Sequence, residues 1–377
     1  MSQFENDEPL TVFGASFATP LQPSAEATAH YLLVTDGMEQ GKYIEVGDEP
    51  VTIGRGAGQT LVIAGDSLVS RQHARVSLVN GQVVAADLGS TNGTFVNAQR
   101  ISSPIALKEG HLVRVGHQVL KYERKSRREV ARAEELRRDL QKATDYVLAL
   151  LPPPIESGPV RAEWHFHPSA QLGGDAFGYD WIDSTTFIFY LVDVSGHGVG
   201  SAMHSVSAMN VLRQRALPGV DFRDPAAVLT SLNARFQMNS HHGLYFTMWY
   251  GVYDTSARML VYSSAGHHPA FLVPDTGGPP QPLGEPDLMI GILPDQIYQT
   301  QQTTIATDAR IYLFSDGVFE IIAKDDSRWS LDNFLPMLRE SGAAARPSPK
   351  QLFEQVKDAA RPGGVEDDFS LLAVTFV

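Results

Sequence analysis

The sequence predicts two folded domains of different class, an all-β sandwich and then an α+β domain, with a helix between them. Short apolar runs separated by Gly, Asn, Asp and Ser fill residues 31–122, as in a β-sandwich. Residues 124–151 lack Gly and Pro and are rich in Arg, Glu, Ala and Leu, which favours a helix. From residue 160 onward, strand-like and helical segments are mixed. We therefore divide the chain into a disordered tail at 1–29, a first domain at 30–123, a helical linker at 124–151 and a second domain at 152–377.

Composition narrows the classes of function. The chain has 377 residues, 43% of them hydrophobic and 19% charged, which is enough to build two cores. Its formal net charge of -13 disfavours nucleic acid and anionic membranes as partners and favours bound cations. With no cysteine, disulfides and thiolate metal sites are excluded. Residues 1–29 do not resemble a signal peptide, and no apolar run is long enough to span a bilayer, so we expect a soluble cytoplasmic protein.

In the first domain, the clearest local signal is a hairpin. Two apolar strands, 76–79 and 82–85, are separated by Asn80-Gly81, a pair typical of tight hairpin turns. Three loop-like segments carry polar groups: 53–55 (IGR), 70–73 (SRQH) and 90–94 (STNGT). Guanidinium, hydroxyl and amide groups are suitable donors for a phosphate, although each segment alone is also ordinary loop sequence.

Together these segments resemble the FHA (forkhead-associated) domain, a β-sandwich that binds phosphothreonine, over residues 31–122. The resemblance implies that the loop around His73 is braced by this histidine, and we expect Asn97 in a turn. The phosphopeptide-binding residues that it implies are Arg55, Ser70 and Arg71 for the phosphate and Thr91 and Asn92 for the peptide.

The linker carries a heptad-like pattern, and two interpretations stay open. It predicts either a coiled coil that forms a homodimer or a single amphipathic helix that packs on its own domain. The helix should end at Pro152, the first of three consecutive prolines. The apolar a/d positions are Ala133, Leu136, Leu140, Ala143, Val147 and Leu150.

In the second domain, Asp-bearing segments adjoin predicted secondary structure. The pattern predicts strands at 186–192, 311–314 and 371–376 and helices at 200–212 and 225–238. Asp next to Gly is common in turns, so one such segment says little. Several acids at strand ends would repel one another unless cations bind, and Mg²⁺ and Mn²⁺ prefer oxygen ligands. The segments are 173–175 (GGD), 192–198 (VDVSGHG), 314–317 (FSDG) and 367–370 (DDFS).

The order GGD, DVSGHG, SAGHHP, SDG and DDFS resembles the SpoIIE-like branch of the PPM (PP2C-type) serine/threonine phosphatases over residues 160–377. The resemblance implies a central β-sandwich flanked by helices and two Mn²⁺ or Mg²⁺ ions. It implies catalytic metal ligation by Asp175 and Asp193, with Asp193 bridging both ions. The further ligands that it implies are the carbonyl of Val194, Asp316 and Asp367. Asp368 and His197 would contact these ligands and not the metal ions.

Two positions depart from the family pattern. The segment GGDAFGYD is longer than the family's GGDFYD, which leaves the role of Asp180 uncertain. Ser264 stands where the family often has Asn before Ala-Gly-His. We expect His197 and His267 to be structural or to support the metal ligands, the alternative for both being a proton donor or phosphate contact.

These resemblances imply a phosphoprotein phosphatase for phosphoserine or phosphothreonine that is recruited through phosphothreonine, and by family analogy a STAS anti-anti-sigma substrate. The main alternative is a phospho-dependent adaptor whose phosphatase fold is not catalytic. A two-metal nuclease is a weaker alternative because the chain is acidic. In the tail, Thr11 lies near acids and suits a kinase; its phosphorylated form could bind the chain's own first domain, the alternative being an unmodified tail.

Overall fold

The structure, a computed structural model, describes residues 28–36, 39–169, 172–241, 243–275, 278–285, 287–339, 346–361 and 364–377. Most of the predicted tail, including Thr11, lies outside the described residues. The chain separates into two compact units, Met1–Arg137 and Arg138–Val377, and each is considered by itself. Among the described helices, none combines the length and the apolar character needed to cross a bilayer.

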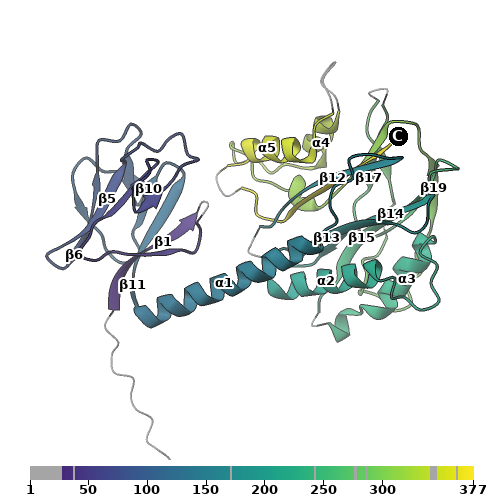
Figure 1. Cartoon of the computed structure of the whole chain (residues 1–377), viewed down its shortest axis with the longest axis horizontal. Helices are drawn as coiled ribbons and strands as arrows, with labels where there is room; N and C mark the ends of the chain where they lie inside the picture. Colours follow the sequence, from purple (N-terminus) through teal and green to yellow (C-terminus); the bar gives the residue numbers. More distant parts are fainter. Residues whose placement is uncertain are drawn as a thin grey trace, which may run out of the picture. The chain divides into compact units, whose positions relative to one another are not determined.

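The first unit is a β-sandwich, as predicted, with two sheets around one core (Figure 1). Fully buried side chains such as Leu32, Ile53 and Val113 belong to this core. One sheet has the order β2 (Tyr43–Glu45), β1 (Thr28–Asp36), β11 (Gln118–Ser126), β10 (Leu112–Val115), β7 (Thr94–Val96), β8 (Gln99–Arg100). The other has the order β4 (Leu61–Val62), β3 (Val51–Gly54), β5 (Ala74–Val79), β6 (Gln82–Asp87), β9 (Ile105–Ala106).

Two tight turns in this unit follow from local sequence. Strands β5 and β6 pair through Val79 and Gln82, which confirms the predicted hairpin. Asn80 and Gly81 have φ angles of 49° and 76°, the left-handed pair that a type I′ turn needs. Asn97 is also in a turn, as expected, with φ at 49°.

Helix α1 (Arg127–Leu150) begins three residues later than predicted, because β11 continues as far as Ser126. Ser126 and Glu129 cap its first turn reciprocally: Ser126 N donates to Glu129 Oε2 at 2.8 Å, and Glu129 N donates to Ser126 Oγ at 3.2 Å. The predicted a/d positions have different environments. Val147 and Leu150 pack against the core of the second unit, whereas Leu136 is 61% exposed.

The second unit has two five-stranded sheets between two layers of helices (Figure 1). Helices α2 (Val199–Arg213) and α3 (Pro225–Arg235) contact one sheet, and α5 (Pro349–Ala359) contacts the other. The first sheet has the order β13 (Asp175–Trp181), β14 (Thr186–Val194), β15 (Phe246–Asp254), β16 (Met259–Ala265), β19 (Gln301–Thr304). The second has the order β12 (Val160–His167), β21 (Phe369–Phe376), β20 (Ala309–Phe314), β17 (Ala270–Val273), β18 (Gln281–Leu283).

Large apolar side chains hold these layers together. Phe177, Phe189 and Leu372 belong to one core cluster that joins both sheets, and each is fully buried. A second cluster packs the β12–β18 sheet against the C-terminal helices. The short elements are η1 (Met238–Ser240), η2 (Asp316–Val318), α4 (Leu331–Phe334) and η3 (Leu335–Leu338). This α+β architecture confirms the predicted fold class and brings strand ends from both sheets together.

Candidate functional site

Acidic residues from both sheets of the second unit lie near one another. Asp175 opens β13 and lies directly opposite Asp193 in the antiparallel pair with β14. Asp316 follows β20, and Asp367 precedes β21, the neighbouring antiparallel strand. The turn after β14 needs two glycines, of which Gly196 has φ at 78°. Strand pairing within each sheet, together with the packing of the two sheets on one core, therefore brings together acids that are almost 200 residues apart in the sequence.

The electrostatics show that these carboxyl groups interact. Burial raises the pKa of Asp193 far above its usual value, and repulsion from Asp316 and Asp367 raises it further. Burial, with repulsion from Asp193 and Asp368, likewise raises the pKa of Asp175. Asp316 has its pKa raised to about 6, by burial and then by Asp367. Protein groups alone therefore do not provide the positive charge that would keep this cluster ionised.

Two observations bear on whether the residues fit divalent cations. Asp175 Oδ2 is buried and has no hydrogen-bond partner, which is costly for a carboxylate unless another ligand approaches it. A Cβ at Gly174 would lie 2.9 Å from the Val194 carbonyl oxygen, so the glycine leaves that oxygen approachable. Among the described residues, no three acidic or imidazole side chains form a compact metal-binding group by themselves. The donor atoms are thus the oxygens that Mg²⁺ or Mn²⁺ prefers, but the described side chains are not already arranged around an ion.

Asp368 has a different environment from the other acids because its oxygens are already hydrogen-bonded. Its Oδ1 accepts hydrogen bonds from Ser169 N at 2.7 Å and from Ser169 Oγ at 2.9 Å. Its Oδ2 accepts one from Gly174 N at 2.6 Å. The buried Asp368 carboxylate therefore fixes the backbone at both ends of the segment that leads into Asp175.

Two serines that the sequence did not single out lock the ends of β20 and β21 together. Ser315 N donates to Ser370 O at 3.0 Å, and Ser370 N donates to Ser315 Oγ at 3.1 Å. Ser315 Oγ also donates to Asp368 O at 2.9 Å. The position of the two serines inside the SDG and DDFS segments was the available sequence signal.

The two histidines proposed for this region lie in unlike surroundings. His197 is exposed in the turn before α2. His267 is buried, and its Nδ1 donates to the His268 carbonyl at 2.7 Å. Burial, and then repulsion from His268, lowers the pKa of His267 well below its usual value. The other ring nitrogen, Nε2, is buried and has no hydrogen-bond partner among the described residues, so a structural role for His267 stays a prediction.

Asp180, whose role the sequence left uncertain, is far along β13 from the acidic end. It is exposed, and its Oδ2 pairs with Arg215 Nη2 at 2.8 Å. This surface ion pair gives Asp180 a partner of its own.

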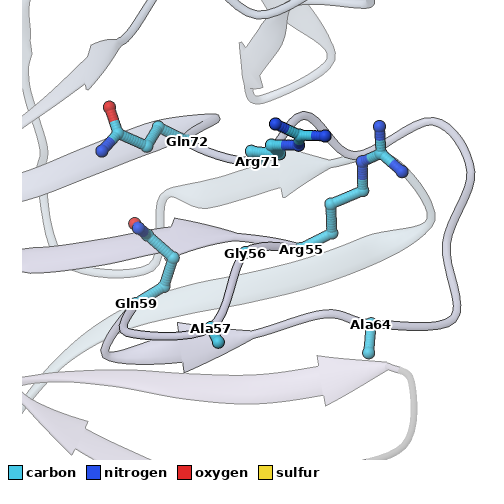
Figure 2. A pocket seen from close by; sticks show the side chains of 7 residues that line it. All are labelled: Arg55, Gly56, Ala57, Gln59, Ala64, Arg71 and Gln72. Carbon is cyan, nitrogen blue, oxygen red and sulfur yellow. The ribbon is translucent and has the colours of Figure 1, made fainter.

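In the first unit, two loops that carry arginines are hydrogen-bonded to each other. Arg55 N donates to Ser70 O at 2.9 Å, and Gly56 N donates to Arg71 O at 3.1 Å. Figure 2 shows the Arg55 and Arg71 side chains near each other along one pocket, with Gln59 and Gln72 at its other end. The pocket has a volume of about 470 Å³ and is lined by Arg55, Gly56, Ala57, Gln59, Ala64, Arg71 and Gln72.

The third loop joins this arrangement through side chains. Thr91 N donates to Ser70 Oγ at 3.1 Å, and Asn92 Nδ2 donates to Leu68 O at 2.8 Å. The fully buried His73 accepts a hydrogen bond from Ser70 N at Nδ1 (3.0 Å) and donates from Nε2 to Gly93 O (3.1 Å). The structure therefore brings all five predicted phosphopeptide-binding residues to adjacent loops, where guanidinium and hydroxyl groups suit a phosphate.

Comparisons with known proteins assign both units. The family model of Stage II sporulation protein E (SpoIIE) matches residues 183–377, and the FHA domain model matches residues 51–116. The first match covers more than half of the chain and includes Asp193, Asp316 and Asp367. It begins after Asp175.

Characterised relatives match the two units separately. The phosphoserine phosphatase RsbP of Bacillus subtilis is 29% identical over 190 residues, which are 49% of this chain and 45% of RsbP. The FHA domain-containing protein FhaB of Mycobacterium tuberculosis is 39% identical over 88 residues, 23% of this chain and 56% of FhaB. The chain thus spans about half the length of the curated relatives that it matches.

A solved structure supports the fold of the second unit. The SiaA-PP2C domain of Pseudomonas aeruginosa aligns with a TM-score of 0.57 and 21% identity, and the alignment covers 66% of this chain and 98% of that domain. At this identity the likeness establishes the fold alone. Because the SpoIIE model covers most of the unit that carries the acidic end, and the FHA model lies on the sandwich before it, the chain belongs to the SpoIIE family and carries an N-terminal FHA domain.

Proposed function

We propose that this protein is a metal-dependent phosphoprotein phosphatase that hydrolyses phosphoserine or phosphothreonine and is recruited through its FHA domain. The observation that carries the proposal is the acidic end of the second unit. There Asp175 and Asp193 lie opposite each other in paired strands. The charges of Asp316 and Asp367, from the other sheet, help to raise the pKa of Asp193. Membership of the SpoIIE family supports the same conclusion.

In this proposal the acids hold two Mn²⁺ or Mg²⁺ ions. Asp175 and Asp193 would be the central residues of this metal site. When bound, such ions neutralise charge on phosphoryl oxygens and acidify a water for in-line attack on phosphorus. The remaining ligands would be the carbonyl of Val194 and the carboxylates of Asp316 and Asp367.

Residues around the acids position them. Asp368 fixes the backbone before Asp175 through its hydrogen bonds to Ser169 and Gly174. The Ser315–Ser370 pair fixes the strand ends beside Asp316 and Asp367. A rigid set of ligands lowers the cost of organising the site for each reaction cycle. No protein nucleophile is required by this arrangement.

The relatives and the first unit support the substrate class that we propose. RsbP is a phosphoserine phosphatase, and we extend phosphoserine to this chain together with a signalling partner such as a STAS anti-anti-sigma protein. The FHA domain would bind a phosphothreonine through Arg55, Ser70 and Arg71. Docking of this kind raises the local concentration of a tethered substrate.

The direct test is Mn²⁺-dependent hydrolysis of para-nitrophenyl phosphate by the full chain. Asp193→Asn is expected to lower kcat by more than about 100-fold, because it removes a charge at the centre of the cluster. Asp180→Asn is the matched control: it removes the same charge from the same sheet, but from a surface ion pair, and should leave kcat unchanged.

The same hydrolysis experiment distinguishes the phosphatase from the adaptor alternative. An adaptor with a non-catalytic phosphatase fold predicts that Mn²⁺ binds, for example by calorimetry, while no ester is hydrolysed. Turnover that is equal in the wild type and in Asp193→Asn would contradict the proposed site.

A further inference from the structure

A third guanidinium lies beside the phosphopeptide loops, outside the motifs that define them. Arg100 is exposed on β8, and its side chain lies over Gly93, the residue after Asn92. A Cβ at Gly93 would collide with Arg100 Nε and would lie 2.9 Å from Arg100 Cζ. Gly93 has φ at 84°, so both its backbone angle and its missing side chain suit this contact.

The charge of Arg100 is not neutralised by the described part of the first unit. None of the ion pairs among the described residues of this unit includes Arg100, whereas Arg127 pairs with Glu45 at 2.9 Å. Phe95 lies directly opposite Arg100 across the β7–β8 hairpin. The guanidinium of Arg114 lies 4.0 Å from the centre of the Phe95 ring, so a second cation lies on the neighbouring strand pair.

Hydrogen bonds connect the loop of Arg55 to the loop of Thr91, and Arg100 lies beside the latter. Arg55 N donates to Ser70 O, and Ser70 Oγ accepts from Thr91 N. Thr91 leads through Asn92 to Gly93, on which Arg100 lies. Arg55 is therefore linked through Ser70 to the start of the Thr91–Gly93 segment, and Arg100 lies at the end of the same segment.

From this placement we infer that Arg100 forms a second anion subsite, which selects phosphothreonine peptides that carry a further negative group near the phosphothreonine. This inference rests on the phosphothreonine binding proposed above. The shared chemistry is a planar or tetrahedral oxyanion, either an Asp or Glu carboxylate or a second phosphate on the same peptide. A guanidinium can donate two parallel hydrogen bonds to either group.

The test measures the affinity of the full chain for fluorescent phosphothreonine peptides by anisotropy. The peptides are matched and differ at one position at a time, which holds Gln, Glu or phosphoserine, on either side of the phosphothreonine. At one position, the wild type should bind the Glu or the phosphoserine peptide about 3- to 10-fold more tightly than the Gln peptide, as a partly exposed charge pair permits. The larger of the two preferences identifies the source of the anion.

The variants assign this preference to a residue. Arg100→Gln should abolish the preference and leave the affinity for the Gln peptide unchanged, and Arg100→Lys should keep part of it. Arg75→Gln is the matched control, because Arg75 is also exposed, on β5, and belongs to neither the motif loops nor β8.

Three results would overturn the subsite. In the first, the wild type binds the charged and the Gln peptides with equal affinity. In the second, Arg100→Gln loses as much affinity for the Gln peptide as for the charged peptides. In the third, Arg75→Gln loses the preference for the charged peptide as Arg100→Gln does. The proposed FHA function is tested separately by Arg55→Ala, which should weaken the binding of every phosphothreonine peptide. If the wild type binds phosphorylated and unphosphorylated peptides alike, that function and the subsite both fail.

Discussion

At the scale of single residues, a missing side chain shapes the acidic end. Gly174 precedes Asp175, and its backbone N–H is held by Asp368 at 2.6 Å. A Cβ there would approach the Val194 carbonyl to 2.9 Å and Gly196 O to 3.2 Å, closer than a carbon normally comes to oxygen. One methyl group would thus displace either Asp175 or the turn after β14.

We predict that Gly174→Ala lowers kcat/KM for para-nitrophenyl phosphate by about 10-fold or more, because small displacements of reacting groups are costly. Affinity for a phosphothreonine peptide should not change. Gly200→Ala is the control: it makes the same substitution in α2, where no atom lies within 4 Å of the added carbon. Equal activities of the two variants would show that the approach of Gly174 to Val194 is unimportant.

In the first unit, a single carboxylate organises the loop that carries Thr91 and Asn92. Asp87 accepts hydrogen bonds from Ser90 Oγ at 2.6 Å and from Thr94 Oγ1 at 2.7 Å, besides the N–H groups of Gly89 and Ser90 at 2.9 Å. Burial alone would raise the pKa of Asp87, but these hydrogen bonds outweigh it and lower the pKa from 3.8 to about 2.

We predict that Asp87→Asn destabilises the first unit by about 1–2 kcal/mol at pH 7. Since the folded pKa is depressed, the wild-type carboxylate contributes its full stability above about pH 4. That contribution is lost as the pH falls through about 2, so wild type and variant should converge in acid. Urea unfolding followed by amide NMR signals of this unit, at pH 7 and pH 2.5, measures the difference. A constant difference at both values would refute the assigned role.

At the scale of elements, α1 has two kinds of surface. Its C-terminal residues Val147 and Leu150 pack against the core of the second unit, which satisfies the apolar pattern locally. Leu136 is 61% exposed at a predicted d position, so the described residues of its unit leave most of this side chain uncovered. A second copy of the helix is the partner that the heptad pattern predicts.

We predict that the full chain is a homodimer and that Leu136→Glu weakens dimerisation at least 10-fold, because it places a charge in an apolar seam. Leu148→Glu is the control, since Leu148 is also exposed on α1 but lies outside the a/d positions. Sedimentation equilibrium measures both variants. A wild type that is monomeric at micromolar concentration and fully active would remove the homodimer hypothesis.

At the scale of the whole molecule, the chain combines a proposed binding unit with a proposed catalytic unit. Each has its own hydrophobic core, so a change in one binding site need not disturb the other. Coupling between them then comes through the substrate, which would be held at one unit while its phosphate reacts at the other.

We predict that Arg55→Ala weakens phosphothreonine peptide binding more than 10-fold and leaves para-nitrophenyl phosphate hydrolysis unchanged. For a protein that carries both phosphothreonine and phosphoserine, KM should rise while kcat stays constant, as expected for lost ground-state binding. Arg75→Ala serves as the control. A parallel fall in para-nitrophenyl phosphate turnover would contradict the independence of the two units.

Much of this molecule follows from sequence alone, where short-range patterns decide backbone conformation. Asn80-Gly81 predicts its hairpin because few other pairs accept two positive φ angles. Alternating apolar residues predict β14 and β21, whose bounds differ from the prediction by only two residues. The motif order likewise predicted both families, because each motif combines a chemical group with the turn that presents it.

Only the tertiary structure decided which side chains meet. The segment GGDAFGYD contains two aspartates, and β13 carries them to opposite ends, so that Asp175 joins the acidic cluster and Asp180 pairs with Arg215. The heptad pattern did not reveal that Val147 packs within its own unit, nor did any motif place Arg100 over Gly93. The physical reason is that strand register and packing bring together residues far apart in the sequence, and no local pattern encodes that distance.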